Sequence, residues 1–433
     1  MNEYDSNRIL DIAKNIGYEA TQTMSEADCY ILNTCHIREK ATDKVYHDVG
    51  RLKKEFRNKK KPILLVVGCV AQAEGDVLLK RENYIDGIIG PQAYHKIPDI
   101  IKSIEKKIRK INFTEFEVIE KFDKLNQLKN NNSKVSAFLT IQEGCDKFCK
   151  FCVVPYTRGP EYSRSFDEIL AEAKQLIING AKEITLLGQN VNAYNFNDKK
   201  LSDLVYGLDL LKGLERIRYT TSHPNDVTED LIKAHKNCKK LMPILHLPVQ
   251  SGSTKILKEM NRKHTRHEYI NIINKLKTSN PLIKFSSDFI IGYPTESEEN
   301  FNETISLMKE IKFINSYSFI YSPRPGTPAS ELKEVNLKIS KARLSTFQKI
   351  ADEIKKDYRS SLLGQELEVL FENKIKNESS YFGRDKYLNS VIAQSDNNLT
   401  GQIRKIKIDK FNYNTLFGKV VVLEKNNKKS VAA

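Results

Sequence analysis

The apolar positions in the N-terminal quarter of the chain alternate between a helical and a strand period. A helical apolar face runs from Ile9 to Ile16 and is closed by Gly17, and two strand-like runs follow at 27–33 and 62–68. Helices that alternate with strands indicate layers of helix packed on a parallel sheet. We therefore expect an α/β domain in this part of the chain.

From Val135 onward, strands and helices alternate regularly. Ser165 and Glu168 have the spacing of a capping box and predict the start of one helix, and Gly180 follows its expected end. The expected strands occupy 135–141, 183–188, 217–221, 243–247, 284–291 and 316–321. Six strands joined by five helical crossovers predict a parallel sheet curled into an incomplete (βα)6 barrel, since right-handed βαβ units continue in one direction.

The C-terminal part begins after a long amphipathic helix that is expected to end near Leu363. Short strands are expected there at 365–371, 389–393, 403–408 and 416–423. Strands of this length predict a small antiparallel barrel, a shape that often binds RNA.

A polar, Asn- and Lys-rich stretch separates the first two of these regions and reads as a linker. The expected parts are an N-terminal domain at 1–113, a linker at 114–134, a central barrel at 135–363 and a small β-barrel at 364–427.

The composition adds a basic charge to this picture. The 433 residues include 70 Lys and Arg against 55 Asp and Glu, which gives a formal net charge of +15. Such a charge favours a polyanionic partner, first of all nucleic acid, although a Lys- and Asn-rich genome would give the same composition. The sequence has no run of 18 or more apolar residues and no signal-peptide pattern, so we expect a cytoplasmic protein with no membrane partner.

Three of the seven cysteines lie within eight residues, at Cys145, Cys149 and Cys152, with the spacing C-x3-C-x2-C. In a reducing compartment, clustered cysteines indicate metal or redox chemistry rather than disulfides. A structural zinc site needs a fourth ligand, and no second Cys or His pair follows nearby. Three thiolates on a short loop suit a 4Fe–4S cluster with one open iron, and this loop follows the first barrel strand, where active sites of such folds lie.

Two further cysteines, Cys35 and Cys69, follow the two strand-like runs of the N-terminal region. Because the carboxyl ends of parallel strands meet at one edge of a sheet, these residues are either ligands of a shared metal centre or core residues. Cys29, inside a strand, and Cys238, outside any motif, are expected to be structural.

The cysteine triplet after a first strand resembles the radical S-adenosylmethionine enzymes, in which the open iron binds S-adenosylmethionine and an electron from the cluster cleaves it to a 5′-deoxyadenosyl radical. Further motifs resemble the methylthiotransferases within that family: NTCHIREKA at 33–41, GCVAQ at 68–72, CVVPYTRG at 152–159, HLPVQSGS at 246–253 and YSPRPGTP at 321–328. They are most similar to the branch that adds a methylthio group to carbon 2 of N6-isopentenyladenosine beside the anticodon of tRNA.

This resemblance covers essentially the whole chain and implies a flavodoxin-like N-terminal α/β domain, a central partial (βα)6 radical-SAM barrel and a C-terminal TRAM barrel. It implies two 4Fe–4S clusters and S-adenosylmethionine as cofactors. By this resemblance the catalytic, radical-generating cluster would be held by Cys145, Cys149 and Cys152, and part of an auxiliary cluster by Cys35 and Cys69. S-adenosylmethionine would lie at strand ends near Gly188, Gln189, Ser222 and Gly292, where each glycine also suits a turn.

Three other side chains near these motifs have open interpretations. Arg158 and Arg164, just past the cysteine loop, suit contact with a nucleotide phosphate or a cofactor carboxylate, or a solvated surface position. His246, at a strand end, suits contact with a cofactor or a buried core position.

One departure from the family concerns the auxiliary cluster. The family supplies its first cysteine in a Gly-Cys-Gln-Met-Asn-x-Tyr-Asp-Ser motif, and this chain begins at the Met of that motif, running from Met1 to Ser6. The expected explanation is a start codon assigned too far downstream, with a decayed gene as the alternative. If Met1 is the true start, we expect cleavage of S-adenosylmethionine without sulfur transfer, because two thiolates hold a cluster poorly.

The implied partners are a tRNA anticodon stem-loop carrying N6-isopentenyladenosine and an electron donor such as a flavodoxin or ferredoxin, and the chain is expected to act as a monomer. Two alternatives place the same chemistry on threonylcarbamoyl-adenosine in tRNA or on an aspartate of a ribosomal protein. A third alternative is a non-catalytic iron–sulfur protein that binds RNA.

Overall fold

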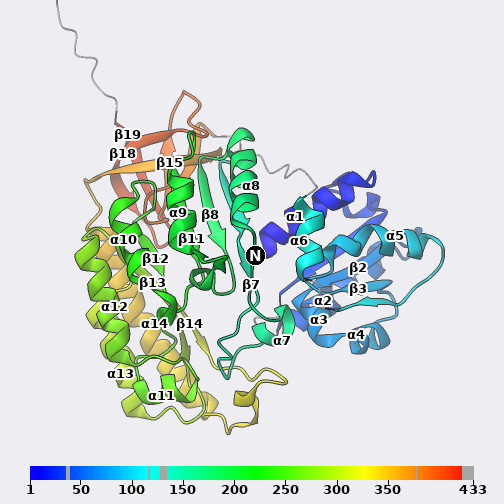
Figure 1. The fold of residues 1–433 in the computed structure, drawn as a ribbon, viewed down its shortest axis with the longest axis horizontal. Coiled ribbons are helices and arrows are strands. Elements are labelled where there is room, and N and C mark those ends of the chain that lie inside the picture. Colours follow the sequence, from blue (N-terminus) through cyan, green and yellow to red (C-terminus); the bar gives the residue numbers. More distant parts are fainter. Residues whose placement is uncertain (36–39, 116–117, 127–133, 377, 422–433) are drawn as a thin grey trace, which may run out of the picture.

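The computed structural model describes residues 1–35, 40–115, 118–126, 134–376 and 378–421. It contains an N-terminal α/β domain, a central barrel of parallel strands and a small C-terminal β-barrel, which follow one another along the chain (Figure 1). The expected fold class is confirmed.

The N-terminal domain is built on a four-stranded parallel sheet whose strands neighbour one another in sequence order. These strands are β1 (Cys29–Thr34), β2 (Ile63–Gly68), β3 (Gly87–Ile89) and β4 (Ile111–Phe113). Leu65 and Val67 of β2 pack on one side and Leu64 and Val66 on the other, which explains the uninterrupted apolar run.

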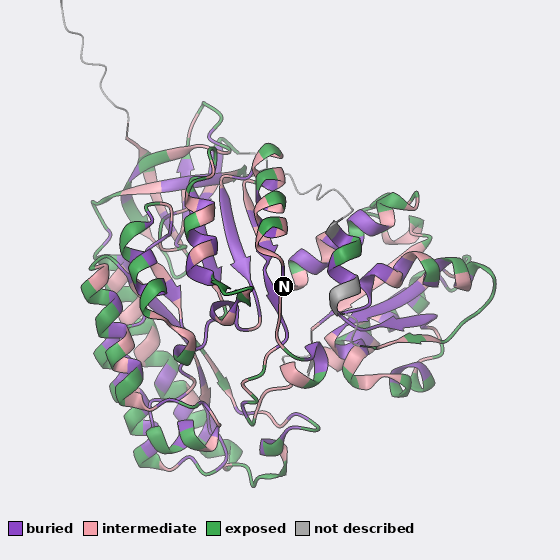
Figure 2. Cartoon of the chain, viewed as in Figure 1, coloured by how far each residue is buried: buried purple, intermediate pink, exposed green. Residues whose placement is uncertain are grey.

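Helices cover both faces of this sheet. One face packs against α1 (Asn2–Asn15), α5 (Ile97–Glu105) and α6 (Val118–Asn126), and the other packs against α2 (Lys40–Glu55), α3 (Cys69–Glu74) and α4 (Asp76–Arg81). Figure 2 shows the sheet as a buried layer between them. Helix α6 lies in the stretch expected to be a linker, and its Phe122 and Leu125 are buried. This connection therefore includes a packed helix, which the polar composition of its surroundings concealed.

The central barrel has six strands, and each bound lies within one residue of its expected position. They are β5 (Ser136–Thr140), β8 (Glu183–Leu187), β11 (Arg216–Thr220), β12 (Ile244–His246), β13 (Lys284–Ile291) and β14 (Asn315–Ile320). They form two three-stranded parallel sheets, and a parallel bridge between Ile217 and Leu241 joins the two. The outer helices are α8 (Phe166–Ile178), α9 (Leu201–Asp209), α10 (Glu229–Asn237), α12 (Arg266–Ser279), α13 (Glu298–Ile311) and α14 (Leu337–Ser360).

The C-terminal barrel is closed and five-stranded, in the order β15-β16-β17-β19-β18. Its strands are β15 (Glu366–Lys374), β16 (Ser380–Arg384), β17 (Ser390–Gln394), β18 (Ile403–Phe411) and β19 (Thr415–Val420). β17 and β19 pair in parallel, so the purely antiparallel expectation is wrong in this detail. A closed barrel with an odd number of strands cannot alternate strand direction all the way round. One parallel pair is therefore the smallest departure from fully antiparallel pairing. Strand β16 was not expected from the sequence, because it has no long apolar run.

Two buried arginines of β11 attach this small barrel to the central one. Arg216 donates to the carbonyl oxygens of Arg384 and Glu368, and Arg218 donates to those of Lys386 and Asp385. Arg218 also pairs with Glu183 at 2.8 Å.

Among the described residues, no helix has the length and apolar character that crossing a membrane requires.

Candidate active site

The cysteine loop lies between the short strand β6 (Gln142–Glu143) and helix α7 (Val154–Arg158), at the carboxyl end of the first barrel strand. Backbone hydrogen bonds brace it from two distant segments: the Lys150 N–H donates to Met260 O, and the Ala329 N–H donates to Lys150 O, both at 3.0 Å. The Asn261 side chain donates to the carbonyl oxygen of Phe148 at 2.9 Å. The loop is therefore held in place by parts of the barrel far away in sequence.

The three thiols of this loop lie close enough to influence one another. Burial, with a smaller contribution from the neighbouring thiols, raises the pKa of Cys145 to about 12 and that of Cys152 to about 11. Backbone N–H groups of Lys147 and Val154 act in the opposite direction, because they donate to these sulfur atoms and stabilise thiolates. This donor set suits an iron–sulfur cluster, whose ligands are thiolates that accept N–H hydrogen bonds.

The third thiol, Cys149, is buried and receives a hydrogen bond from Arg262 Nη1 at 3.6 Å. Arg262 is itself buried, and its Nη2 donates to the carbonyl oxygen of Pro248. A fixed guanidinium thus lies beside a cysteine sulfur. Among the described residues, no three His, Cys, Asp or Glu side chains converge on a single metal ion. A 4Fe–4S cluster does not require this, because each of its cysteine ligands binds a different iron atom.

The residues expected near S-adenosylmethionine all follow carboxyl ends of barrel strands, so the structure brings them to the same rim as the cysteine loop. Gln189 Oε1 accepts the N–H of Gly144 at 2.8 Å, directly before Cys145. At Gly188, a Cβ atom would lie 2.6 Å from Gln142 Oε1, so glycine is needed there for packing. Ser222 is buried and its hydroxyl has no hydrogen-bond partner among the residues that the structure describes, which leaves it available to a ligand.

Gly292 has a more local role in the structure. Its φ of +71° favours glycine, its N–H donates to the Glu296 carboxylate at 3.2 Å, and Ser340 of α14 fills the space that a Cβ would need. Arg343 of the same helix pairs with Glu296 at 2.9 Å. These contacts fix the turn after β13 onto α14.

Cys35 and Cys69 leave the ends of two neighbouring strands, as expected. β1 and β2 pair in parallel with Thr34 opposite Gly68, so the next residue on each strand is a cysteine. The Thr34 hydroxyl accepts the N–H of Val70 and donates to the carbonyl oxygen of Val67, which ties the two ends together. Of the other two cysteines, Cys238 is buried in the barrel core.

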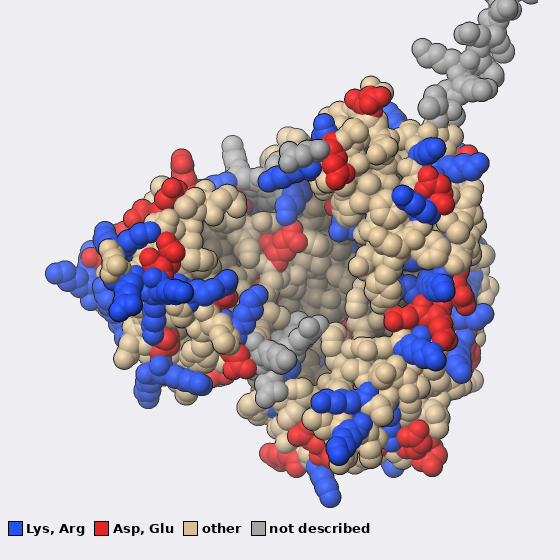
Figure 3. Space-filling model, turned by 180° about the vertical axis from the view of Figure 1, so that it is seen from behind, with Lys and Arg blue, Asp and Glu red and all other residues tan. Residues whose placement is uncertain are grey.

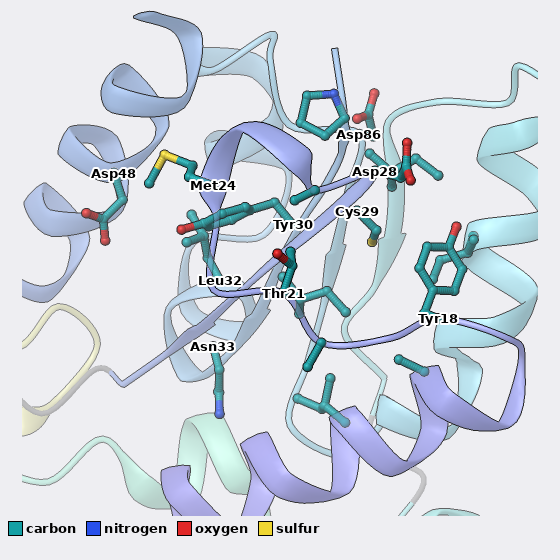
Figure 4. Close-up of a pocket in the computed structure, with 18 of the residues that line it drawn as sticks. Tyr18, Thr21, Met24, Asp28, Cys29, Tyr30, Leu32, Asn33, Asp48 and Asp86 are labelled. Carbon is teal, nitrogen blue, oxygen red and sulfur yellow. The ribbon is translucent and has the colours of Figure 1, made fainter. Parts of the chain in front are cut away.

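A groove of about 1720 Å³ runs along β1, the edge strand of the N-terminal sheet. Its lining extends from Tyr18 and Cys29 to Cys35. In Figure 4, Tyr18, Met24 and Tyr30 lie along it and Asn33 lies toward α1. Cys29 is half-buried in its wall, where burial raises the pKa of the thiol to about 12.

A buried ion network joins the N-terminal domain to the cysteine loop. Arg158, at the end of α7, pairs with Asp5 of α1 at 2.8 Å and lies 3.5 Å from Glu143 of β6, and Lys121 of α6 pairs with Glu143 at 2.7 Å. Burial alone would raise the pKa of Asp5, but Arg158 and Lys121 more than offset it, so this pKa lies below the usual value. Glu143 directly precedes Gly144 and Cys145, so the network connects the two cysteine-bearing regions.

The expectation of a solvated surface position is therefore wrong for both Arg158 and Arg164. Their side chains are only 3% and 1% exposed, which excludes a solvated surface, and their partners are protein groups. Arg164 pairs with Glu172 at 2.8 Å and donates to the carbonyl oxygen of Thr140. The missed signal was their position between two domains that pack closely together.

A group of polar side chains surrounds the start of the cysteine loop and was not expected from the sequence. Asn190 donates to Asp226 at 2.8 Å and to Glu161 at 3.2 Å, and Lys147 pairs with Asp226 at 2.8 Å. These residues lie on separate loops, so no sequence spacing could have grouped them.

The surface between the N-terminal domain and the rest of the molecule is hollowed (Figure 3).

Comparison with known proteins agrees with this arrangement. Residues 139–308 match the model of the radical SAM superfamily, and residues 1–90 match the uncharacterized protein family UPF0004. A protein of Pelagibacter ubique named tRNA-2-methylthio-N(6)-dimethylallyladenosine synthase is 57% identical over all of this chain and 97% of its own length. A protein of the same name from a Ruegeria species is 46% identical over 97% of this chain and 96% of its own length.

Among solved structures, the radical S-adenosylmethionine methyltransferase TsrM from Kitasatospora setae, with cobalamin and a 4Fe–4S cluster bound, superposes with a TM-score of 0.57. It covers 76% of this chain and 74% of its own chain at 11% identity, which is a likeness of fold. The sequence identity to the two bacterial proteins extends over both cysteine regions and the whole barrel. This chain therefore belongs to the tRNA-2-methylthio-N(6)-dimethylallyladenosine synthase family of radical SAM enzymes.

Proposed function

We propose that this chain is a tRNA methylthiotransferase that replaces the hydrogen on carbon 2 of N6-isopentenyladenosine, beside the anticodon, with a methylthio group. The observation that carries the proposal is the buried Asp5–Arg158–Glu143 network, because it connects the N-terminal domain that bears Cys35 and Cys69 to the strand that leads into Cys145. Radical formation and sulfur insertion must act on the same carbon. This requires the region with Cys35 and Cys69 to keep a fixed position relative to the loop with Cys145.

In this proposal, Cys145, Cys149 and Cys152 hold the radical-generating cluster, and Cys35 and Cys69 hold part of the auxiliary cluster. When bound, the first cluster supplies the electron that cleaves S-adenosylmethionine to a 5′-deoxyadenosyl radical. Gln189 orients the loop through Gly144, and the free hydroxyl of Ser222 is a donor for the cofactor at the rim. Gly188 and Gly292 shape the strand ends that border the cofactor.

The remaining proposals concern the wider context. A small electron carrier such as a flavodoxin or ferredoxin delivers the electron, and the protein acts as a cytoplasmic monomer on tRNA. Support for the monomer is that one chain supplies both cysteine regions and the barrel. The proposed functional units are 1–113, 135–363 and 364–427, with 114–134 as their connection.

The test uses purified, iron- and sulfide-reconstituted protein with dithionite, S-adenosylmethionine and a synthetic anticodon stem-loop carrying N6-isopentenyladenosine. We expect 5′-deoxyadenosine and a 2-methylthio nucleoside, both detected by mass spectrometry, and neither with Cys145→Ala. Methylthiolation of a threonylcarbamoyl-adenosine stem-loop or of a ribosomal protein instead would reassign the substrate. Binding of RNA without any 5′-deoxyadenosine would indicate a non-catalytic protein.

A further inference from the structure

The two faces of the sheet formed by β12, β13 and β14 have opposite characters. Phe289 of β13 is fully buried and packs against Phe347 of α14, with ring centroids 4.7 Å apart. The register sets Ser318 opposite Phe289, so this serine shares the face that α14 covers. The other face carries Asp288 and Ile290 of β13 opposite Tyr317 and Phe319 of β14.

The aromatic side chains on this inner face are unusually open for the interior of a strand. Tyr317 is 51% exposed and Phe319 is 42% exposed. They occupy alternate positions of β14, so their side chains lie on the same face of the sheet. A pair of neighbouring, half-exposed aromatic rings on one sheet face is a surface on which a flat ligand can stack.

A polar pair lies at one end of this aromatic surface. His246 of β12 has its Nε2 atom 3.4 Å from Asp288 Oδ2 and its Nδ1 atom hydrogen-bonded to the Ser286 hydroxyl at 3.0 Å. Its ring meets the Tyr317 ring edge-on, with 5.9 Å between the centroids. His246 and Asp288 remain 19% and 33% exposed at their side chains. They can therefore still hydrogen-bond to a ligand, and the expectation of a buried core position for His246 is wrong.

The opposite end of the aromatic surface reaches the cysteine loop. Ile290, which the register sets opposite Phe319, packs on the small cluster that contains Tyr293 and Tyr321, and so does Phe151 from between Cys149 and Cys152. A ligand stacked on Tyr317 and Phe319 would thus lie beside the site where the radical forms.

We propose that Tyr317, Phe319, His246 and Asp288 form the pocket for the substrate base, an adenine that carries an apolar prenyl group. This inference rests on the proposed function. An enzyme that modifies a base carbon takes that base out of its stack, and aromatic side chains then replace the lost stacking. The two rings offer that stacking and an apolar surface for the prenyl group, while His246 and Asp288 offer hydrogen bonds to the polar edge of the purine.

The test measures binding, so it does not depend on sulfur transfer. The probe is a fluorescein-labelled anticodon stem-loop, made with N6-isopentenyladenosine and, separately, with adenosine at the same position. Wild-type protein should bind the prenylated form more tightly. Loss of base stacking in the double variant Tyr317→Ala/Phe319→Ala should weaken binding of the prenylated form about tenfold and bring the affinity ratio of the two probes close to one.

Three controls separate a pocket from a structural role. Tyr317→Phe should keep the wild-type ratio, and Tyr206→Ala, an exposed tyrosine of α9, should leave both affinities unchanged. Cleavage of S-adenosylmethionine without RNA should continue in the double variant. A wild-type affinity ratio in the double variant would overturn the inference. A raised KM for S-adenosylmethionine would also overturn it, because the rings would then belong to the cofactor site. Failure of methylthiolation in a wild-type protein that still discriminates the probes would contradict the proposed function alone.

Discussion

Arg262 places a permanent positive charge next to a cysteine sulfur of the candidate active site. Its Nη1 lies 3.6 Å from Cys149 Sγ, its Nη2 is held by Pro248 O, and the side chain is buried. A cation that donates to a cluster ligand stabilises the reduced, more negative state. Charge at this position should therefore set how easily the site accepts an electron.

We predict that Arg262→Gln lowers the reduction potential of the reconstituted radical-generating site by on the order of tens of millivolts, measured by a redox titration followed by electron paramagnetic resonance. Arg262→Lys keeps the charge and should stay closer to wild type. Equal midpoints in Arg262→Gln and wild type would show that this contact has no electrostatic role.

Glu296, behind the turn at Gly292, gives the fold a dependence on pH. Burial raises its pKa from 4.5 to about 7, although the Gly292 N–H and Arg343 act against the shift. Because the folded value lies above the unfolded one, protonation favours the folded state, and this contribution is lost as the pH rises through about 7.

Between about pH 5 and pH 8 the free energy of unfolding should consequently fall by at most roughly 3 kcal/mol. Glu296→Gln cannot ionise and should lack this fall. Urea denaturation of both proteins across this range provides the comparison, and parallel curves would contradict the assignment.

At the scale of elements, the Arg158 network is the most consequential contact because it joins α1, α6, β6 and α7. Replacing Arg158 with Met leaves Asp5 buried without its strongest partner, and breaking a buried pair in this way costs about 3–5 kcal/mol. We predict a loss of this size in chemical denaturation. Lys59→Met breaks the exposed pair with Glu55 and should cost less than about 1 kcal/mol.

The same substitution has a functional consequence that general destabilisation does not explain. Below its unfolding temperature, Arg158→Met should produce more 5′-deoxyadenosine for each methylthio nucleoside, because the network no longer fixes the position of one cysteine region relative to the other. An unchanged ratio of the two products would mean that the network stabilises the fold without positioning the chemistry.

Elements with strong apolar periodicity could be predicted from the sequence, and those defined by tertiary contact could not. All six barrel strands were recognisable because they alternate regularly with helices along the chain, and the spacing of Cys145, Cys149 and Cys152 indicated the site. Helix α6 was missed because it is short and is followed by a polar, Asn- and Lys-rich stretch. The partners of Arg158 were unpredictable for a related reason, since Asp5 lies 153 residues away in sequence.

At the scale of the molecule, the C-terminal barrel presents a basic surface. Arg404, Lys405, Lys407 and Lys410 are exposed along β18, and the chain as a whole carries +15. Arg216 and Arg218 of the central barrel fix this β-barrel through its backbone carbonyl groups. Backbone contacts of this kind leave exposed side chains such as Lys407 and Lys410 available to the phosphates of RNA.

We therefore predict that Lys407→Glu with Lys410→Glu weakens tRNA binding and lowers the slope of log affinity against log salt by about two. The matched control, Lys277→Glu with Lys309→Glu, makes the same change in net charge on the outer helices α12 and α13. Equal losses in both variants would indicate that only the total charge matters.

The most direct test of the whole assignment is nucleoside mass spectrometry of tRNA from cells that carry or lack this gene. Deletion should abolish 2-methylthio-N6-isopentenyladenosine and leave N6-isopentenyladenosine in its place, and the native gene, but not its Cys145→Ala form, should restore the modified nucleoside. Unchanged 2-methylthio-N6-isopentenyladenosine in the deletion strain would contradict the assignment.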